Sequence, residues 1–415
     1  MFRVSVWSSR HLARGAFLAL AFAIGAVWGV SAASGVAPPE DRAVTGLGRD
    51  PVVQSPQISV VNMLRQRFET LMDGDLSRIQ PNYAMDEPGG EYAWIKEQDR
   101  TAYFRAWLDE RGLVLESASA WFEVDSVISL GRGSYRLEVT EHAKYEYRLA
   151  EGGANAQSAH AAGDAGDASV QQPMHAFGSR TVHVLEVVAA LEGGWKIAYD
   201  WYADPLGEGA FTPGKGQVVP SASGTQPGPT ERAPSEPDSS AQPERFDREK
   251  AAEYALRYSG VRSLPGGGKY NRSFEVYSYV GGDCANFVSQ VLAAGGLPQD
   301  WGWGYSRGGS VSWTCSQDLI WYLMGSGTGR RVYRGDFAGA LLPLPGETRG
   351  AIGLLQPGDV IGYETGGEVS HVAVVAAIDP YGWPVIASHT ADRLYFPWDL
   401  GWDQDTVFWF VHIAY

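Results

Sequence analysis

The spacing of apolar residues changes from a helical to a strand period along the first half of the chain. Residues 58–72, ISVVNMLRQRFETLM, carry apolar side chains every three or four positions, which predicts an amphipathic helix that ends before Asp73-Gly74. A second helix is expected around residues 97–112. Alternation of apolar and polar residues then predicts four strands, in residues 118–130, 134–149, 179–191 and 195–203. Helices followed by a meander of antiparallel strands indicate an α+β domain.

Composition divides the chain into five parts. Residues 206–245 are dominated by Pro, Ser and Gly, which cannot bury enough apolar surface to fold, so we expect a flexible linker there. The linker separates an α+β accessory domain, residues 56–205, from a C-terminal domain, residues 246–415. Residues 33–55 are expected to form a flexible lead, and residues 1–32 a signal peptide.

The first residues have the pattern of an export signal. Arginines precede the apolar run GAFLALAFAIGAVWGV, and VSAAS supplies the small residues beside which a signal peptidase cuts. Cleavage after Ala32 or Ala33 would leave no second apolar stretch of membrane length. The alternative is an uncleaved anchor, for which the run is slightly short. We therefore expect a protein that is secreted, or held in the cell envelope, without a stable membrane span.

Charge and cysteine content exclude several classes of protein. The 48 acidic and 33 basic residues give a formal charge of −15, which argues against nucleic acid as a partner because nucleic acids reward basic surfaces. The chain has two cysteines, Cys284 and Cys315, too few for a small disulfide scaffold. We expect a free, buried Cys315; a disulfide with Cys284 is the alternative. The composition gives no information on oligomeric state.

The accessory domain carries polar residues but no pattern that indicates a site. Its order of helices and strands resembles the cystatin/NTF2-like α+β fold. The alternating polar residues are interpreted as an outer sheet face, and they include His142, Glu146, His175 and Glu186.

The C-terminal domain combines three predicted helices with a strand-rich end. The helices are expected in residues 246–260, 284–296 and 316–327. Between the last two lies a Trp-rich loop, residues 300–313. Strands are predicted in GDVIGYE, SHVAVVAAID, PVIASHT and TVFWFVHIAY. A helix that bears a cysteine, followed by an antiparallel sheet that bears histidines, is the order of parts in papain-like thiol hydrolases.

The stretch VGGDCANFVSQVL places Cys284 at the start of a helix. Gly281 and Gly282 permit a tight turn, and Asp283 is expected at the N-cap position. A cysteine in the first turn lies near the positive end of the helix dipole and near unpaired N–H groups, which favours the thiolate. The same N–H groups could receive an oxyanion. The alternative is a small, buried apolar cysteine.

A base is expected on the hairpin that follows. His371 lies near the start of an alternating strand, and the turn after Asp379 returns the chain so that His389 is expected on the same face. Cys284, His371 and His389 then form a nucleophile, its base and the group that orients the base. Asp392 is the alternative orienting residue, which would require a bulge. These two histidines and Asp392 could instead hold a metal, but their spacing is not that of a tight metal-binding pair, so we expect neither metal nor cofactor.

The C-terminal motifs resemble the amidase domain family of secreted bacterial proteins. GGDCANFVSQVLAAGG, preceded by FDREKAAEYALRY and YNRSFEVYSYV, is similar to the DC-x-NFVSQ box of that family, and the resemblance covers roughly residues 246–415. Such domains are grouped with the papain-like NlpC/P60 and CHAP-like thiol hydrolases, which cleave amide bonds in cell-wall peptides. The resemblance implies Cys284 as nucleophile and His371 as base; the third catalytic position corresponds only loosely to His389.

These observations together predict an exported cysteine amidohydrolase that acts on cell-wall peptides or other amides. One alternative is a non-catalytic binding module with a degenerate papain-like domain. Another is a thiol acyltransferase with the same site, which would pass the acyl group to an amine instead of to water.

Overall fold

The computed structural model describes residues 55–150, 173–207, 246–278, 281–345, 350–402 and 405–415. The chain divides into two compact units, residues 1–52 and 53–415, and every described residue belongs to the second. The expected signal peptide, and nearly all of the expected lead and linker, lie outside the described residues.

The N-terminal part consists of two long helices and four antiparallel strands. Helix α2 spans Pro56–Asp73, which confirms the helix predicted from apolar spacing, and it ends at Gly74, whose φ of 79° favours glycine. Two short 3-10 turns follow, η1 (Leu76–Arg78) and η2 (Gln80–Asn82). The strands are β1 (Leu113–Gly131), β2 (Ser134–Leu149), β3 (His175–Ala189) and β4 (Trp195–Trp201).

Helix α3 is longer than the apolar pattern predicts. It spans Pro88–Glu110, so it begins about nine residues before the expected start. Pro88 occupies the first turn, where a missing N–H costs nothing and the fixed φ suits a helix. The two glycines that follow lie against the backbone of β4 and of Ala84, where a Cβ would clash. Close packing on the sheet therefore explains why the helix begins in the Pro-Gly-Gly stretch at residues 88–90, which the apolar pattern does not predict to be helical.

The C-terminal part contains short helices and six strands. The helical segments are α5 (Arg248–Tyr258), α6 (Cys284–Ala294), α7 (Val311–Thr314), α8 (Ser316–Ser326), α9 (Phe337–Leu341) and η3 (Ala351–Leu354). The strands are β5 (Gly329–Gly335), β6 (Val360–Thr365), β7 (Glu368–Ile378), β8 (Pro384–Ser388), β9 (Asp392–Pro397) and β10 (Val407–Ile413). The mixture of helices with antiparallel strands confirms the α+β class.

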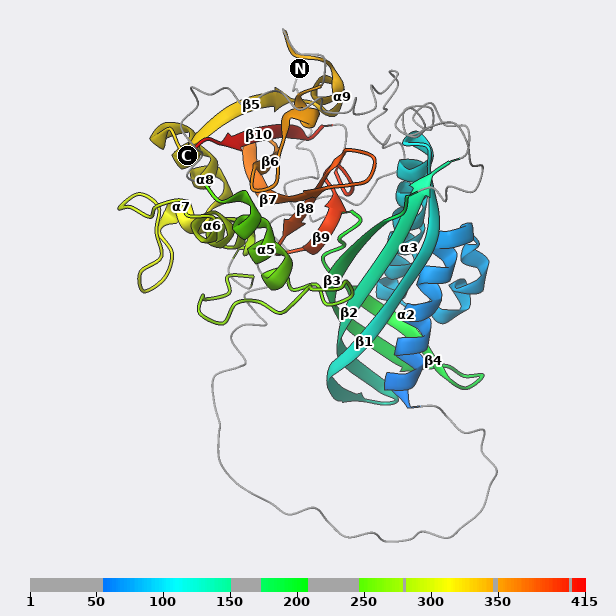
Figure 1. Cartoon of the computed structure of the whole chain (residues 1–415). Helices are drawn as coiled ribbons and strands as arrows, with labels where there is room; N and C mark the ends of the chain where they lie inside the picture. Colours follow the sequence, from blue (N-terminus) through cyan, green and yellow to red (C-terminus); the bar gives the residue numbers. More distant parts are fainter. Residues whose placement is uncertain (1–54, 151–172, 208–245, 279–280, 346–349, 403–404) are drawn as a thin grey trace, which may run out of the picture. The chain divides into compact units, whose positions relative to one another are not determined.

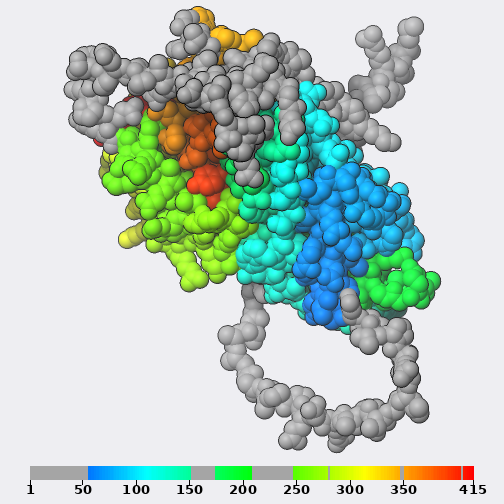
Figure 2. Space-filling model, turned by 45° about the vertical axis from the view of Figure 1, so that its right-hand side comes forward, coloured from blue at the N-terminus to red at the C-terminus, as the bar shows by residue number. Residues whose placement is uncertain are grey.

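The strands of both parts join in a single sheet. Its order is β1-β2-β3-β9-β8-β7-β6-β10-β5, with β4 also paired to β3. β9 pairs with the first half of β3, at Gly178, Ser179 and Arg180, and β4 pairs with the second half. The two sets of strands are seen on either side of this junction in Figure 1. The space-filling view shows the yellow-green surface around α5 adjoining the cyan surface of β1 and β2 (Figure 2).

Side chains cross the same junction. Arg262, after α5, forms an ion pair with Glu123 of β1, and the Ser263 hydroxyl donates to the Ala143 carbonyl of β2. Arg393 of β9 donates from Nε to the Pro205 carbonyl at 3.0 Å. The N-terminal and C-terminal parts are therefore connected by backbone pairing and by side-chain contacts, of which that of Arg393 is buried.

Apolar clusters cover both faces of the C-terminal strands. One cluster packs helices α5, α6 and α8 against β6, β7 and β10, and it contains Cys284 and Phe287. The other is shared with the N-terminal part: Phe104 and Trp107 of α3 lie in one buried cluster with Tyr363 and Phe408. A third cluster fills the space between α2, α3 and the first strands. Helix α3 therefore packs on the face of the C-terminal sheet opposite to the cysteine-bearing helix.

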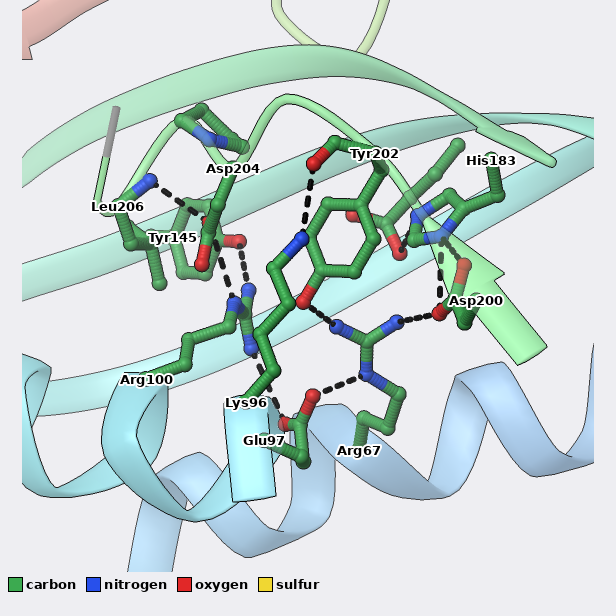
Figure 3. Close-up of polar contacts among 12 residues, drawn as sticks. Arg67, Lys96, Glu97, Arg100, Tyr145, His183, Asp200, Tyr202, Asp204 and Leu206 are labelled. Carbon is green, nitrogen blue, oxygen red and sulfur yellow. Dashed lines mark hydrogen bonds and ion pairs between the residues drawn. The ribbon is translucent and has the colours of Figure 1, made fainter. Parts of the chain in front are cut away.

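The interior of the N-terminal part contains a network of charged residues (Figure 3). Arg67 of α2 pairs with Glu97 of α3, with Nε 2.6 Å from Oε2, and donates to the Tyr202 hydroxyl. Asp200 of β4 lies 3.5 Å from the same guanidinium and 3.0 Å from Nδ1 of His183. Every one of these side chains is at least nine-tenths buried, so the charges are compensated by one another and not by water.

The expected outer face of the accessory sheet is in part an interior. His142 is fully buried, with its ring stacked on Trp121 at 4.0 Å, and His175 is 7% exposed with Nε2 2.7 Å from the Tyr395 carbonyl. The reason is the junction with the C-terminal part, which covers this face and which alternation within one strand does not reveal. Glu146 and Glu186 keep the expected partly exposed positions, in ion pairs with Lys144 and Arg136.

Candidate active site

Cys284 occupies the first turn of α6, as the sequence predicts. The two glycines before it have φ values of 130° and 122°, a region that side chains with a Cβ avoid, so the sharp approach to the helix depends on Gly281 and Gly282. The first α-helical hydrogen bond runs from the Phe287 N–H to the Asp283 carbonyl. The N–H groups of residues 284–286 therefore precede the helical ladder and lie at the positive end of the helix dipole.

A second helix begins beside the same sulfur. Helix α8 starts at Ser316, whose Oγ lies 3.2 Å from the Cys284 Sγ, within hydrogen-bond distance. The Ser316 side chain is largely buried, which limits competition from water for this contact. The hydroxyl stabilises a thiolate more than a thiol because it donates to the sulfur. The sequence offered one signal for this residue, its place at the start of a predicted helix directly after Cys315.

His371 lies close enough to Cys284 to alter its acidity. Burial alone would raise the pKa of the Cys284 thiol, but the charge of His371 and a hydrogen bond from it act in the opposite direction. Hydrogen bonds from Ser316 and from the Val372 N–H act in the same direction as His371. The outcome is a thiol pKa below its ordinary value, although Cys284 is only 6% exposed. A buried thiol would otherwise be a poor nucleophile.

Aromatic rings enclose the His371 imidazole. His371 pairs with Tyr363 across β6 and β7, and their ring centroids are 5.6 Å apart. Trp402 lies at the same distance from His371 and stacks on Tyr363 at 4.0 Å. The Tyr363 hydroxyl donates to the Trp398 carbonyl at 2.7 Å, which fixes the strand to the segment that carries Trp402. The imidazole is therefore held in a packed aromatic environment, 4% exposed.

Asp283 stands at the N-cap position but does not cap the helix through its side chain. Its Oδ1 accepts hydrogen bonds from the Tyr277 N–H at 2.8 Å and from the Asn286 amide at 2.9 Å. Its Oδ2 lies 2.6 Å from Nδ1 of His389. The carboxylate thus ties the chain before Cys284 to other elements, and no side-chain bond to the first-turn N–H groups is formed.

His389 lies beside Asp283 and not beside His371. Its Nε2 is 2.8 Å from the Tyr258 carbonyl, so both ring nitrogens have acceptors. Its faces are covered by Tyr270 at 3.7 Å and Phe287 at 4.0 Å, both nearly parallel to the imidazole. The structure therefore brings Cys284 together with His371, and Asp283 with His389, as two separate pairs.

A β-bulge explains the position of His389. The hairpin turn forms as expected, with the Asp379 N–H bonded to the Trp383 carbonyl. However, the pairing of β7 with β8 shifts by one residue between Val375 and Ala377. Since a shift of one residue changes which side chains share a face, the bulge separates His389, which packs on Phe287 of α6, from His371, which lies between Cys284 and Trp402.

Asp392 belongs to the His389 side of the site. It accepts hydrogen bonds from the Tyr270 hydroxyl and from Arg180 of β3, the latter at 3.1 Å. Burial raises the pKa of its carboxyl, against the opposing charges of His389 and Arg180. Asp392 thus supports the ring that stacks on His389, and its contacts do not include His371. Tyr270 was not singled out from the sequence, where it appears only as the aromatic residue of YNR.

Cys315 does not form a disulfide with Cys284. Both cysteines are free, and Cys315 is partly exposed where the sequence suggested a buried residue. Its position at the N-cap of α8, before the first turn, accounts for the exposure. Burial and the Asp318 carboxylate raise the pKa of the Cys315 thiol. The surroundings of Cys284 therefore make its thiol more acidic, whereas the surroundings of Cys315 make its thiol less acidic.

The described residues contain no cluster of three His, Cys, Asp or Glu side chains placed to hold a metal ion. His371 pairs with Cys284, whereas His389 and Asp392 both contact Tyr270, so the three side chains are not brought together at one point. Among the described helices, none is long and apolar enough to cross a membrane.

Comparison with known proteins gives matches to parts of the chain. The protein "Uncharacterized protein YhbB" of Bacillus subtilis (strain 168) is 30% identical over 156 residues, which are 35% of this chain and 42% of that protein. The chain thus spans less than half the length of this curated relative.

Two solved structures are similar to parts of the chain. Aln2 from a Streptomyces species has a TM-score of 0.22 and 11% identity, over 36% of this chain and 92% of that one. The intermembrane space region of chloroplast protein ARC6 has a TM-score of 0.22 and 16% identity, over 37% and 98% of the two chains. TM-scores this low carry no argument about fold or function.

A protein-family model covers the part of the chain that contains the site. Residues 245–411 match the model described as "Putative amidase domain", and this range includes the Cys284–His371 pair. The C-terminal part of the chain is therefore amidase-like.

Proposed function

We propose that the chain is a cysteine-dependent amidase in which Cys284 is the nucleophile and His371 the general base and acid. The observation that carries the proposal is the set of hydrogen bonds that His371, Ser316 and the Val372 N–H make to the buried Cys284 sulfur, which lowers the pKa of the thiol. Burial acts in the opposite direction, so the arrangement around the sulfur has to overcome it. Such a pairing is expected of an activated nucleophile and is not needed for packing.

The reaction would proceed through an acyl-enzyme. The Cys284 thiolate attacks the amide carbonyl carbon, and the oxyanion that forms is stabilised by N–H groups at the start of α6. The His371 imidazolium gives its proton to the leaving nitrogen as the C–N bond breaks, which leaves a thioester on Cys284. Water, deprotonated by His371, then attacks the thioester and releases the acid and the free thiol.

The residues predicted beside this pair receive supporting roles in the proposal. Asp283 and His389 hold the chain at the start of α6, and Asp392 supports Tyr270 against His389. These contacts act on the position of the nucleophile and not on the imidazole of His371. We infer that they are positioning residues, because they contact the backbone and rings around Cys284 and not the sulfur.

We also propose a fold class for each part of the chain, export of the protein, and a substrate. A helix that begins at Cys284, packed on an antiparallel sheet that bears His371, is compatible with a papain-like arrangement. Two helices on one curved sheet are compatible with a cystatin/NTF2-like N-terminal part. Export rests on the sequence of residues 1–32, and amide bonds of cell-wall peptides are proposed as the substrate from the sequence resemblance.

A test compares the two cysteines. The full-length mature chain, Cys284→Ala and Cys315→Ala are incubated with purified peptidoglycan, and newly exposed amino and carboxyl groups are quantified. The proposal expects that Cys284→Ala loses at least about a thousandfold in rate, of the order seen on removal of a catalytic nucleophile, while Cys315→Ala stays active. Equal circular dichroism spectra would show that both variants are folded.

Other outcomes separate the alternatives. Binding of peptidoglycan by wild type and Cys284→Ala without any product would indicate a binding module and overturn the proposal. Products that carry an added amine in place of free acid would indicate acyl transfer by the same thiol. Equal activity of all three proteins would exclude cysteine catalysis.

A further inference from the structure

Helix α3 of the N-terminal part contacts the segment that packs against the proposed base. The Tyr103 hydroxyl donates to the Trp402 carbonyl at 2.9 Å and accepts a hydrogen bond from the Gly401 N–H at 3.0 Å. The Trp402 ring lies 5.6 Å from the imidazole of His371 and stacks on Tyr363. A single residue therefore stands between Tyr103 and His371, although Tyr103 belongs to the other part of the chain.

Helix α3 also holds the beginning of the same segment. Trp107 donates from Nε1 to Oδ2 of Asp399 at 3.1 Å, and Arg111 donates from Nε to the same oxygen at 2.6 Å. Arg111 also lies over the rings of Trp107 and Phe337. Residues 399–402 are thus attached to one side of α3 at both ends.

The contacts between α3 and residues 399–402 are buried, which makes the loss of any one of them costly. Tyr103, Asp399 and Trp402 are 7%, 4% and 6% exposed, so water does not replace a lost partner readily. The segment continues the aromatic packing that encloses His371, and packed interiors transmit a displacement because they contain few voids. A change in the position of Trp402 would therefore free the imidazole to rotate. Rotation matters because only one orientation directs a ring nitrogen at the sulfur.

We propose that Tyr103 is a positioning residue for His371. Through Gly401 and Trp402 it fixes the aromatic wall that keeps the imidazole in reach of Cys284, so the N-terminal part completes the site. The inference rests on the proposed function, because it assigns a role in the Cys284–His371 pair. It goes beyond that function because it makes the N-terminal part necessary for the acidity of the thiol.

The chain offers a matched control for this inference. Tyr147 of β2 is also buried and also donates across the junction, from its hydroxyl to Oδ2 of Asp379 at 2.9 Å. Asp379 lies in the β7–β8 turn, which does not contact the His371 ring. Tyr103→Phe and Tyr147→Phe therefore remove the same group from the same junction, and only the first affects the wall of His371.

The readout is the acidity of Cys284 in the full-length mature chain. Wild type, Tyr103→Phe, Tyr147→Phe and His371→Ala are alkylated with iodoacetamide from pH 4 to pH 10, and the Cys284 adduct is quantified by mass spectrometry with the Cys315 adduct as internal reference. We expect Tyr103→Phe to raise the midpoint of the Cys284 profile by about one unit. Below the midpoint the rate should fall about threefold, since a tenfold loss of thiolate is partly offset by higher nucleophilicity. Tyr147→Phe should keep the wild-type midpoint.

The other possible outcomes contradict either the role of Tyr103 or the Cys284–His371 pairing. A Tyr103→Phe profile equal to wild type, while His371→Ala raises the midpoint, would overturn the inference and leave the proposed function standing. Equal shifts in Tyr103→Phe and Tyr147→Phe would also overturn it, because they would indicate general loosening of the junction. An unchanged midpoint in His371→Ala would overturn the Cys284–His371 pairing itself. Melting temperatures of the two Tyr→Phe variants show whether their structural cost is comparable.

Discussion

Nδ1 of His389 lies 2.6 Å from Oδ2 of Asp283, the residue directly before Cys284. The other ring nitrogen faces the Tyr258 carbonyl at 2.8 Å. A carboxylate and a carbonyl are both acceptors, so both ring nitrogens of His389 have an oxygen partner. The pair is almost fully buried between Tyr270 and Phe287. A buried, hydrogen-bonded pair thus anchors the start of the cysteine-bearing helix.

Substitutions of Asp283 test this anchoring. Asp283→Ala leaves His389, the Tyr277 N–H and the Asn286 amide without their acceptor, and we expect it to lower the free energy of unfolding by about 3–5 kcal/mol. Asp283→Asn retains one oxygen acceptor for the Tyr277 N–H and the Asn286 amide and changes only the contact to His389. We therefore expect a smaller loss for Asp283→Asn, about 1 kcal/mol. Urea unfolding of the two variants measures the difference.

The result would also separate anchoring from capping. If the carboxylate stabilised the helix only through its charge at the N-terminus, both variants would lose a similar, small amount, below about 1 kcal/mol. A loss from Asp283→Asn as large as that from Asp283→Ala would contradict this expectation, because it would place the whole effect in the contact to His389.

Local patterns in the sequence were sufficient to predict much of the secondary structure and the position of the proposed nucleophile, Cys284. The apolar spacing in residues 58–72 predicted α2, and the Asp379–Trp383 turn formed as expected. The position of Cys284 at a helix start followed from two glycines, an aspartate and an apolar repeat, all within about a dozen residues. Features of this kind depend on neighbours in the sequence, which is why periodicity reveals them.

The remaining features depend on contacts between distant segments. Pairing of β3 with β9 joins residues more than 200 positions apart, and nothing in the alternation of either strand specifies the partner. The bulge at Val375–Ala377 separates His389 from His371, and the stretch AVVAAI contains no glycine to indicate a bulge. The stacking of Tyr270 on His389 likewise joins separate elements.

Ser316→Ala should make the Cys284 thiol less acidic. Its hydroxyl lies 3.2 Å from the sulfur and helps to lower the thiol pKa, so its removal should raise the midpoint of the alkylation profile by about half a unit. Ser326→Ala, at the far end of α8, is the control because its hydroxyl bonds to Leu323, Thr328 and Tyr322, away from Cys284. Identical profiles for the two variants would show that the hydroxyl does not act on the thiolate.

Arg67→Met should destabilise the protein strongly because it leaves buried carboxylates uncompensated. Arg67 pairs with Glu97 and Asp200 in the interior shown in Figure 3, and loss of one partner of a buried pair costs about 3–5 kcal/mol. Arg136→Met removes the partner of Glu186 in an ion pair on the surface, for which about 0–1 kcal/mol is expected. Urea unfolding curves of both variants, compared with wild type, measure the contrast. Equal losses would mean that the buried network contributes no more than a surface pair.

His142 should make the protein less stable on the acid side of neutrality. Burial and the nearby charges of Arg262 and Arg180 lower the pKa of His142 to about 4, from 6.5 for an ordinary histidine. The folded protein therefore binds fewer protons at this site than the unfolded chain between pH 6.5 and pH 4. The free energy of unfolding should fall across that window as the pH falls, and the site should contribute no pH dependence above it.

A comparison with His142→Gln isolates this contribution. Glutamine does not titrate, and its amide oxygen can accept the hydrogen bond that Nε2 of His142 now receives from Arg262. We expect the wild type to lose about 2 kcal/mol more than His142→Gln between pH 6.5 and pH 4, because each pKa unit corresponds to about 1.4 kcal/mol and part of the shift is screened by water. Urea unfolding at half-unit steps of pH gives both curves. Parallel curves would mean that His142 titrates normally and that the junction over β2 opens to water in acid.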